Sequence, residues 1–408
     1  MPAPPPNYPP PPQPGPYGQQ PPMYGVPTPQ PPPPAQPGTI PLTAQTLGSV
    51  YSGGWRTITQ NPGAMLGQPA LWYTLAALAL TAPLTVWLVR LLNYIWQVTL
   101  TESAGQLMGP TDAKAMVAWV LQDMVLWAGL GMLVYSVLVL IGTAITVAPT
   151  MRATVGLPTR AGQSWRLLKP ALPRILLAGI ISWAAGVAVL ALVVWLSYVW
   201  MSAAMDADFA GGQAGVDAAL ELSLGSTWFT VVVYVLEIAF FLLVIRFVYV
   251  LPAMVVENLG LFAALKRSWN LVKGRYWQVL GTLVLGSMII SFVMGLLLSV
   301  LIVIVVFAGV LTMDLENFGT SINGLAIWSG VAIFLSVALS LIAMFLILPV
   351  AVLTYADTRI RKEGLLGELT AAGFQDPTIA AARAGDEQAL AVVADYIPGT
   401  VAHDRRFL

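Results

Sequence analysis

Six long apolar segments limit what this chain can fold into more than any other feature. Each one reaches the roughly 20 residues that a helix needs to cross a bilayer. They lie near Leu71–Leu92, Val117–Pro149, Ile175–Trp200, Trp228–Val250, Val279–Val306 and Leu325–Leu353. Only 9% of the 408 residues are charged, whereas a soluble domain carries about 25%. The sequence therefore predicts an all-α integral membrane protein with six transmembrane helices.

Basic residues gather in two of the loops between these segments. The loops from Thr150 to Arg174 and from Asn258 to Arg275 hold Arg152, Arg160, Arg166, Lys169, Arg174, Lys266, Arg267, Lys273 and Arg275. The three other loops contain Lys114 as their single basic residue and carry acidic residues instead. Since basic loops face the cytoplasm, the pattern predicts a multi-pass plasma-membrane protein with both termini cytoplasmic.

The inventory of reactive side chains is short. The chain has no cysteine and a single histidine, His403, so clustered zinc sites and two-histidine chemistry cannot be built from it alone. Its 19 basic and 19 acidic residues cancel, which removes any argument from bulk charge for nucleic-acid binding. We expect no catalytic residue, no metal and no cofactor, and therefore no enzyme.

Similar segments recur along the chain. The run from Gly156 to Lys169 aligns without gaps with the run from Gly260 to Lys273, and Leu47–Ile58 is a weaker third copy. A fixed period indicates repeated supersecondary units. The predicted units are three helix-pair repeats, each preceded by a cytoplasmic amphipathic helix, at about 46–150, 156–253 and 260–353.

The predicted amphipathic helices place tryptophan and basic residues at the inner membrane surface. This combination is typical of a helix that lies among lipid headgroups, and each basic residue near an anionic leaflet gains about 1 kcal/mol. The candidate lipid-interface residues are Trp55, Arg56, Trp165, Arg166, Lys169, Lys266, Arg267, Trp269 and Lys273. Membrane lipids, anionic ones in particular, are therefore the expected partners. The alternative is a solvated charged face that only sets the topology.

Four charged residues fall inside the predicted spans, namely Arg90, Asp123, Glu237 and Arg246. Such residues are functional candidates by default. Arg90 and Asp123 both belong near the outer face, where a structural ion pair is one interpretation, and Arg246 is placed to reach the cytoplasmic interface. Glu237 lies deep in its span, so it is a candidate proton or cation site. It could equally bond to a neighbouring helix or be protonated.

Two terminal segments differ in composition from the spans. Residues 1–42 are proline-rich and uncharged, which predicts a disordered cytoplasmic tail. This tail is either simply solvated or an arm that docks in an aromatic-lined groove of a protein partner. Residues 43–366 form the predicted six-span membrane domain, and residues 367–408 form a cytoplasmic C-terminal tail in which Pro377 to Ala394 favours a short helix.

Three sequence blocks resemble a known family. They read IPLTAQTLGSVYSGGWRTITQNPGAMLG from Ile40, AALKRSWNLVKGRYWQVLG from Ala263 and TYADTRIRKEGL from Thr354. The chain is similar here to actinobacterial multi-spanning proteins labelled "glycerophosphoryl diester phosphodiesterase membrane domain". In that family the catalytic barrel, which uses two histidines and carboxylates around a metal, is a separate domain. The resemblance thus implies membrane residence and fold, and it carries over no catalytic residue.

Two hypotheses for function follow. The first is a non-catalytic membrane scaffold or lipid-interacting protein that works through its basic interfacial helices and its Pro-rich arm. The second is a transporter or flippase-like protein with a path between the repeats and Glu237 as its coupling group. A transporter needs a polar cavity at mid-membrane, and the spans offer few polar residues to line one.

Overall fold

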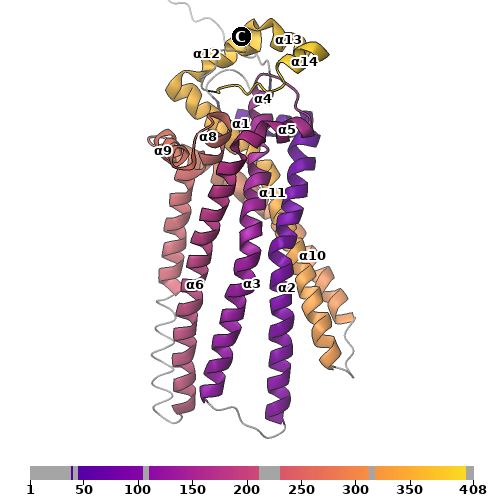
Figure 1. Ribbon diagram of the computed structural model, residues 1–408, viewed down its shortest axis with the longest axis vertical. Helices are drawn as coiled ribbons and strands as arrows, with labels where there is room; N and C mark the ends of the chain where they lie inside the picture. The colour runs from indigo at the N-terminus through magenta and orange to yellow at the C-terminus, as the bar shows by residue number, and fades with distance from the viewer. Residues whose placement is uncertain (1–37, 40–44, 104–109, 211–229, 312–317, 401–408) are drawn as a thin grey trace, which may run out of the picture. The chain divides into compact units, whose positions relative to one another are not determined.

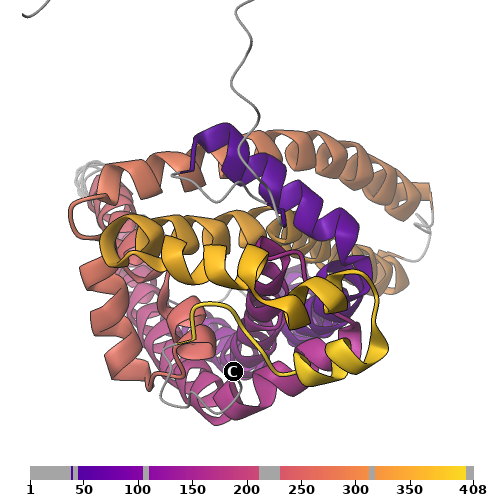
Figure 2. The same ribbon diagram turned by 90° about the horizontal axis from the view of Figure 1, so that it is seen from above.

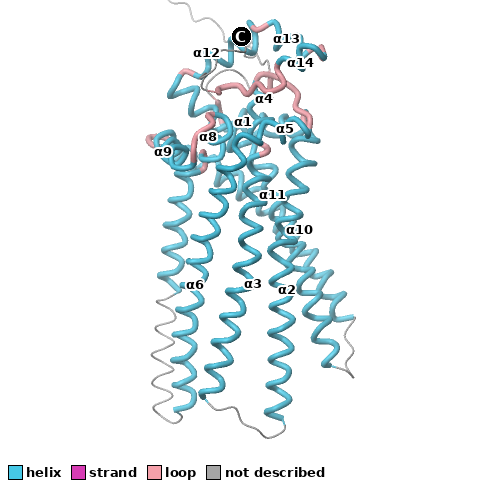
Figure 3. Tube along the Cα trace, in the orientation of Figure 1, coloured by secondary structure: helices cyan, strands magenta, loops and turns pink. Residues whose placement is uncertain are grey.

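The computed structural model describes residues 38–39, 45–103, 110–210, 230–311 and 318–400. All regular elements in these ranges are helices (Figure 3). Most of the Pro-rich tail, Trp228 at the start of the fourth predicted span, and His403 lie outside them.

Six helical stretches are long and apolar enough to cross a membrane. They are Gly63–Gln97, Lys114–Thr154, Ala161–Ala203, Thr230–Val256, Tyr276–Leu311 and Ala326–Glu363. These stretches contain or overlap the six apolar segments of the sequence, so the predicted all-α class and six spans are confirmed.

The helices fall into a long and a short class. The long ones are α2 (Gln68–Ser103), α3 (Pro110–Ala144), α6 (Leu172–Ala210), α10 (Tyr276–Leu311) and α11 (Phe318–Glu363), with a further helical run over residues 230–244. The short ones are α1 (Leu47–Gln60), α4 (Val147–Thr154), α5 (Ala161–Leu168), α8 (Val250–Val256), α9 (Leu261–Val272), α12 (Leu365–Thr370), α13 (Pro377–Arg383) and α14 (Glu387–Val392). Single tighter or wider turns lie at Gly63–Gly67 (η1), Lys169–Ala171 (η2), Ile245–Phe247 (η3) and Ala371–Gln375 (η4).

Local sequence explains several of the helix ends. Thr46 caps α1 in a reciprocal box with Ser49, and Asp376 and Asp386 cap α13 and α14 by accepting hydrogen bonds from the first backbone N–H groups. Such caps satisfy donors that a helix start leaves open. Gly364 separates α11 from α12 because its φ of 72° lies in the left-handed region that favours glycine.

The short helices gather at one end of the long ones, which we call the basic end because both basic loops lie there (Figure 1). The largest apolar core is also here and joins α4, α8 and α9. All eight residues of α4 are buried. By contrast, every residue from 230 to 241 is exposed, as expected of a helix that faces lipid. The largest packed core of the described residues therefore lies at the basic end, away from the exposed stretch 230–241.

Each tryptophan-bearing short helix packs against the end of a span. Helix α5 contacts α4, α9 contacts α8, and α1 contacts α11, beside which it lies in Figure 2. A Cβ added at Gly54 of α1 would stand 3.1 Å from Val350 Cγ2, so glycine permits this approach. In terms of the predicted repeats, each short helix contacts the closing segment of the preceding unit, and the first contacts that of the last. This order suits three repeats arranged in a ring, which stays a prediction.

Candidate functional site

The basic-end part of α11 carries Asp357, a buried carboxylate that holds three segments together. Asp357 accepts hydrogen bonds from the backbone N–H of Gln45 at 2.9 Å, from Arg275 at 3.0 Å and from Arg361 at 2.9 Å. Its side chain is 5% exposed. Four residues along α11 bring Arg361 back over the carboxylate, as helical spacing requires. Asp357 therefore ties the start of α1 and the start of α10 to α11.

A second buried carboxylate, Glu257, follows α8. It accepts hydrogen bonds from Arg267 of α9 at 2.9 and 3.1 Å and from the Tyr355 hydroxyl of α11. Arg267 also pairs with Glu363 at 2.6 Å, and Arg359 pairs with Glu363 at 3.0 Å. We call Glu257, Asp357, Glu363 and their arginines Arg267, Arg275, Arg359 and Arg361 the ion-pair network.

The charges of the ion-pair network stabilise one another. Partial burial acts to lower the pKa of Arg267, but hydrogen bonds from its guanidinium to Glu363 and Glu257 outweigh that effect and raise the pKa. Lys362 extends the network by donating to the backbone oxygens of Asn270 and Leu271, which lie at the end of α9. A cation at a helix C-terminus also interacts favourably with the helix dipole.

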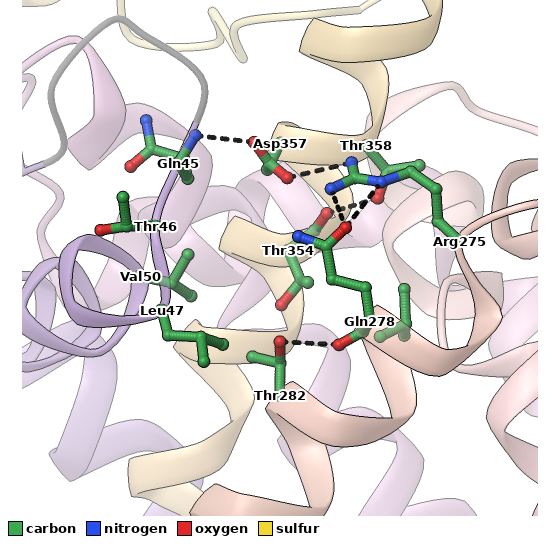
Figure 4. Close-up of a pocket in the computed structure, with 11 residues that line it drawn as sticks. Gln45, Thr46, Leu47, Val50, Arg275, Gln278, Thr282, Thr354, Asp357 and Thr358 are labelled. Carbon is green, nitrogen blue, oxygen red and sulfur yellow. Dashed lines mark hydrogen bonds and ion pairs between the residues drawn. The ribbon is translucent and has the colours of Figure 1, made fainter.

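Figure 4 shows a small pocket beside Asp357, between α1, α10 and α11. Its walls include Thr46, Val50, Gln278, Thr282 and Thr354. The Arg275 guanidinium is held by two residues that also line the pocket, because it donates to Asp357 and to the Gln278 side-chain oxygen, the latter at 2.6 Å. Thr282 and Thr354 donate to backbone oxygens of their own helices. These polar groups of the pocket are thus already engaged in hydrogen bonds within the protein.

A different arrangement surrounds Arg152 in α4. This arginine is completely buried, and its Nη1 donates to the backbone oxygens of Val393 at 2.8 Å and Tyr396 at 2.6 Å. Its Nε donates to Thr159 Oγ1 at 3.2 Å. Arg152 therefore fixes residues 393–396, which we call the C-terminal turn, against the basic end.

The rest of the C-terminal segment, residues 365–400, is attached in the same manner. Arg383 donates to the Val155 oxygen at 2.8 Å, Gln163 to the Ala394 oxygen at 2.6 Å, and Arg359 to the Gly399 oxygen at 2.7 Å. An apolar cluster that includes Leu157, Leu369 and Ile379 lies beneath. Burial raises the pKa of Tyr396 to about 12, since the ionised phenol would lose its hydration. The segment is packed against the membrane domain over these contacts.

The candidate lipid-interface residues divide into an exposed and a less exposed group. Trp55, Arg56, Arg166, Lys169, Lys266, Trp269 and Lys273 are exposed. Trp165 instead stacks on Trp72 with ring centroids 5.4 Å apart, and Arg267 belongs to the ion-pair network. These two hold helices in place, whereas the exposed residues remain candidates for lipid contact.

The charged residues inside the spans have separate environments. Arg90 and Asp123 form the ion pair considered from the sequence, with Nε and Oδ2 3.0 Å apart. The Arg246 guanidinium lies over the rings of Trp269 at 4.6 Å and Tyr276 at 4.8 Å. Glu237 lies within the exposed stretch 230–241. The structure therefore brings Arg90 and Asp123 together and keeps Glu237 apart from both.

Sequence reasoning missed Glu257, Asp357, Arg359 and the burial of Arg152. One signal was available, because Glu257 directly precedes a basic loop, and Asp357 and Glu363 lie among basic residues at the end of the last span. Acidic side chains in such positions are expected to form ion pairs with neighbouring basic side chains. No signal distinguished Arg152 from the exposed arginines of its loop.

In the part of the chain that the structure describes, no three histidine, cysteine, aspartate or glutamate side chains come together as metal ligands. The buried carboxylates Glu257 and Asp357 already accept hydrogen bonds from arginine side chains.

Six apolar helices with their packed basic end define a multi-pass helical membrane protein. Residues 220–365 match the family model for the membrane domain of glycerophosphoryl diester phosphodiesterase. The match confirms the resemblance over those residues, which include α9, α10, α11 and the whole ion-pair network. The first block, from Ile40, lies outside the matched range, so its similarity to the family rests on the sequence motif alone. Neither a curated protein nor a solved structure matches the chain.

Proposed function

We propose that this protein is a non-catalytic lipid-interacting scaffold of the plasma membrane that contacts anionic headgroups at its basic end, with both termini cytoplasmic. One observation carries the proposal. Trp55, Phe262 and Trp277 are 61%, 76% and 76% exposed, on helices α1, α9 and α10. Exposed Lys266 and Lys273 are on the same α9 segment. Aromatic rings beside cations are typical of the headgroup layer of a membrane.

The transporter alternative has weaker support. A coupling carboxylate should face a cavity between the repeats. Glu237 instead lies on a stretch whose residues 230–241 are all exposed, and the pocket beside Asp357 is lined by residues of other helices. The scaffold is therefore the function that the geometry supports best.

The proposal is tested by measuring lipid selectivity in a mixed bilayer. The triple variant Lys169→Gln, Lys266→Gln and Lys273→Gln removes three exposed cations and keeps the ion-pair network intact. The protein is reconstituted with phosphatidylcholine and phosphatidylglycerol, and spin-labelled analogues of each report which lipid contacts it. At about 1 kcal/mol per basic residue, the preference for phosphatidylglycerol should fall about tenfold or more.

Lys114→Gln is the matched control, because Lys114, near the start of α3, is predicted to lie on the other side of the membrane. It should leave the preference unchanged. If the triple variant keeps the wild-type preference, or if wild type shows none, the lipid-interface proposal is wrong and the charges only set topology.

A further inference from the structure

The loop that contains Arg152 lacks counter-charges of its own. Residues 124–205 include five basic residues and no aspartate or glutamate. Within the described ranges, no carboxylate forms an ion pair with Arg152. Asp395 pairs with Arg166 at 3.1 Å and is itself 75% exposed. Arg152 is thus a fully buried cation whose hydrogen-bond acceptors are neutral oxygens.

A buried cation whose hydrogen-bond acceptors are all neutral is unusual, because removing a charge from water is costly unless an anion compensates. The Asp395 carboxylate acts on Arg152 electrostatically without forming a direct ion pair with it. Arg152 donates to oxygens of Val393, Ala394, Tyr396, Pro158 and Thr159. Three of these five acceptors belong to the C-terminal turn. Gln163 Nε2 donates to the same turn at the Ala394 oxygen. The turn therefore presents a group of oxygens to donors that would also fit an oxyanion.

Guanidinium groups bind phosphate with particular strength, since two parallel N–H donors match two of its oxygens. Exposed Arg166 stands beside the turn through its pair with Asp395. If the turn moved away, Arg152, Gln163 and Arg166 would be left without the oxygens of residues 393–396 and without Asp395. The vacated place would be strongly cationic.

The C-terminal segment has three features that favour its local opening. Its helices α13 and α14 have seven and six residues, too few to be stable alone. Gly364, with its φ of 72°, joins the segment to α11. Its attachment to the membrane domain depends on single arginines that donate to backbone oxygens and on a limited apolar cluster. Local opening of such a unit requires less free energy than global unfolding.

We propose that Arg152, Gln163 and Arg166 form a binding site for a phosphate group, and that the C-terminal turn occupies this site until a phosphate-bearing ligand displaces it. The phosphate can come from a lipid headgroup or from a soluble phosphate, because both present the same oxygens. Ligand binding and release of the C-terminal segment are then linked, so each favours the other. This inference does not depend on the exposed lysines of the proposed lipid interface.

The test measures hydrogen exchange of the backbone amides in residues 387–397 of the full-length wild-type protein. One sample in a neutral detergent receives inorganic phosphate, and its control receives chloride at equal ionic strength. A second sample compares bilayers of phosphatidylglycerol with bilayers of phosphatidylcholine. Faster exchange with phosphate, with phosphatidylglycerol or with both supports the site and identifies the source. No change in either comparison overturns it.

A set of variants tests the role of Arg152 in phosphate binding. Ile397 is 8% exposed and packs in the core beneath the turn, so Ile397→Asn should release the turn without adding charge. This variant should bind inorganic phosphate at least tenfold more tightly than wild type in a calorimetric titration. Adding Arg152→Gln should remove that gain, whereas adding Arg160→Gln, an exposed arginine of the same loop, should keep most of it. A released turn with no gain in phosphate binding contradicts the proposal.

Discussion

In the loop around α9, two partly buried arginines face carboxylates, whereas the fully buried arginine of α4 donates to neutral oxygens. Arg267 and Arg275 are matched by Glu257, Glu363 and Asp357, which come from other parts of the chain. Within the described part of the chain, Arg152 donates hydrogen bonds to backbone and hydroxyl oxygens alone. The two loops look alike in sequence, and both are basic. The comparison shows that two basic loops with similar sequences can differ in structure. One holds its arginines in ion pairs with carboxylates, and the other holds a buried arginine that binds backbone and hydroxyl oxygens.

The largest effect in this comparison is expected from removing the charge of Glu257, a carboxylate of the ion-pair network. Glu257→Gln leaves Arg267 and Arg359 with one acidic partner, Glu363, in place of two. Breaking a buried charge pair from one side costs about 3–5 kcal/mol. We expect a large fall in the thermal unfolding temperature of the detergent-solubilised protein.

The control for this change is Glu387→Gln in α14, an exposed carboxylate outside the ion-pair network. Surface substitutions usually change stability by about 0.5 kcal/mol or less, so its melting curve should overlay that of wild type. Equal melting temperatures for Glu257→Gln and Glu387→Gln would show that the network contributes no stability.

Arg152→Gln tests the other side of the comparison and should act locally. The change removes charged donors to Val393 and Tyr396, and hydrogen bonds to charged groups contribute about 1.5–3 kcal/mol each. Hydrogen exchange in residues 387–397 should therefore quicken by roughly tenfold to a hundredfold. The long helices should keep their protection. Equal loss of protection in α2 and α3 would place Arg152 in the global core instead.

The smallest effect is expected at Arg166. Its ion pair with Asp395 joins side chains that are 56% and 75% exposed, and exposed pairs contribute about 0–1 kcal/mol. Arg166→Gln should leave both the melting temperature and the exchange of the C-terminal segment almost unchanged. An effect as large as that of Arg152→Gln would mean that the exposed pair, and not the buried arginine, holds the segment.

The sequence predicted what depends on composition and spacing. Apolar run length indicated six spans, and the positions of Arg90 and Asp123 near one face allowed their ion pair. What it could not supply was contact between residues far apart along the chain. Glu257 meets Tyr355 at a separation of 98 residues, and Gln45 meets Asp357 at a separation of 312. The ion-pair network depends on such pairings, so charge counts in each loop could not reveal which arginines are neutralised.

The distance along the chain between Arg152 and the C-terminal turn has a consequence for biosynthesis. The bond from Arg152 to the Val393 oxygen spans 241 residues, and four further membrane spans lie between them. At ribosomal rates of about 5–20 residues per second, roughly 12–48 s pass between the synthesis of Arg152 and that of Val393. During this interval its guanidinium must stay hydrated or be held by another molecule at the membrane surface. Docking of the turn is therefore a late step of assembly, which follows the synthesis of all six spans.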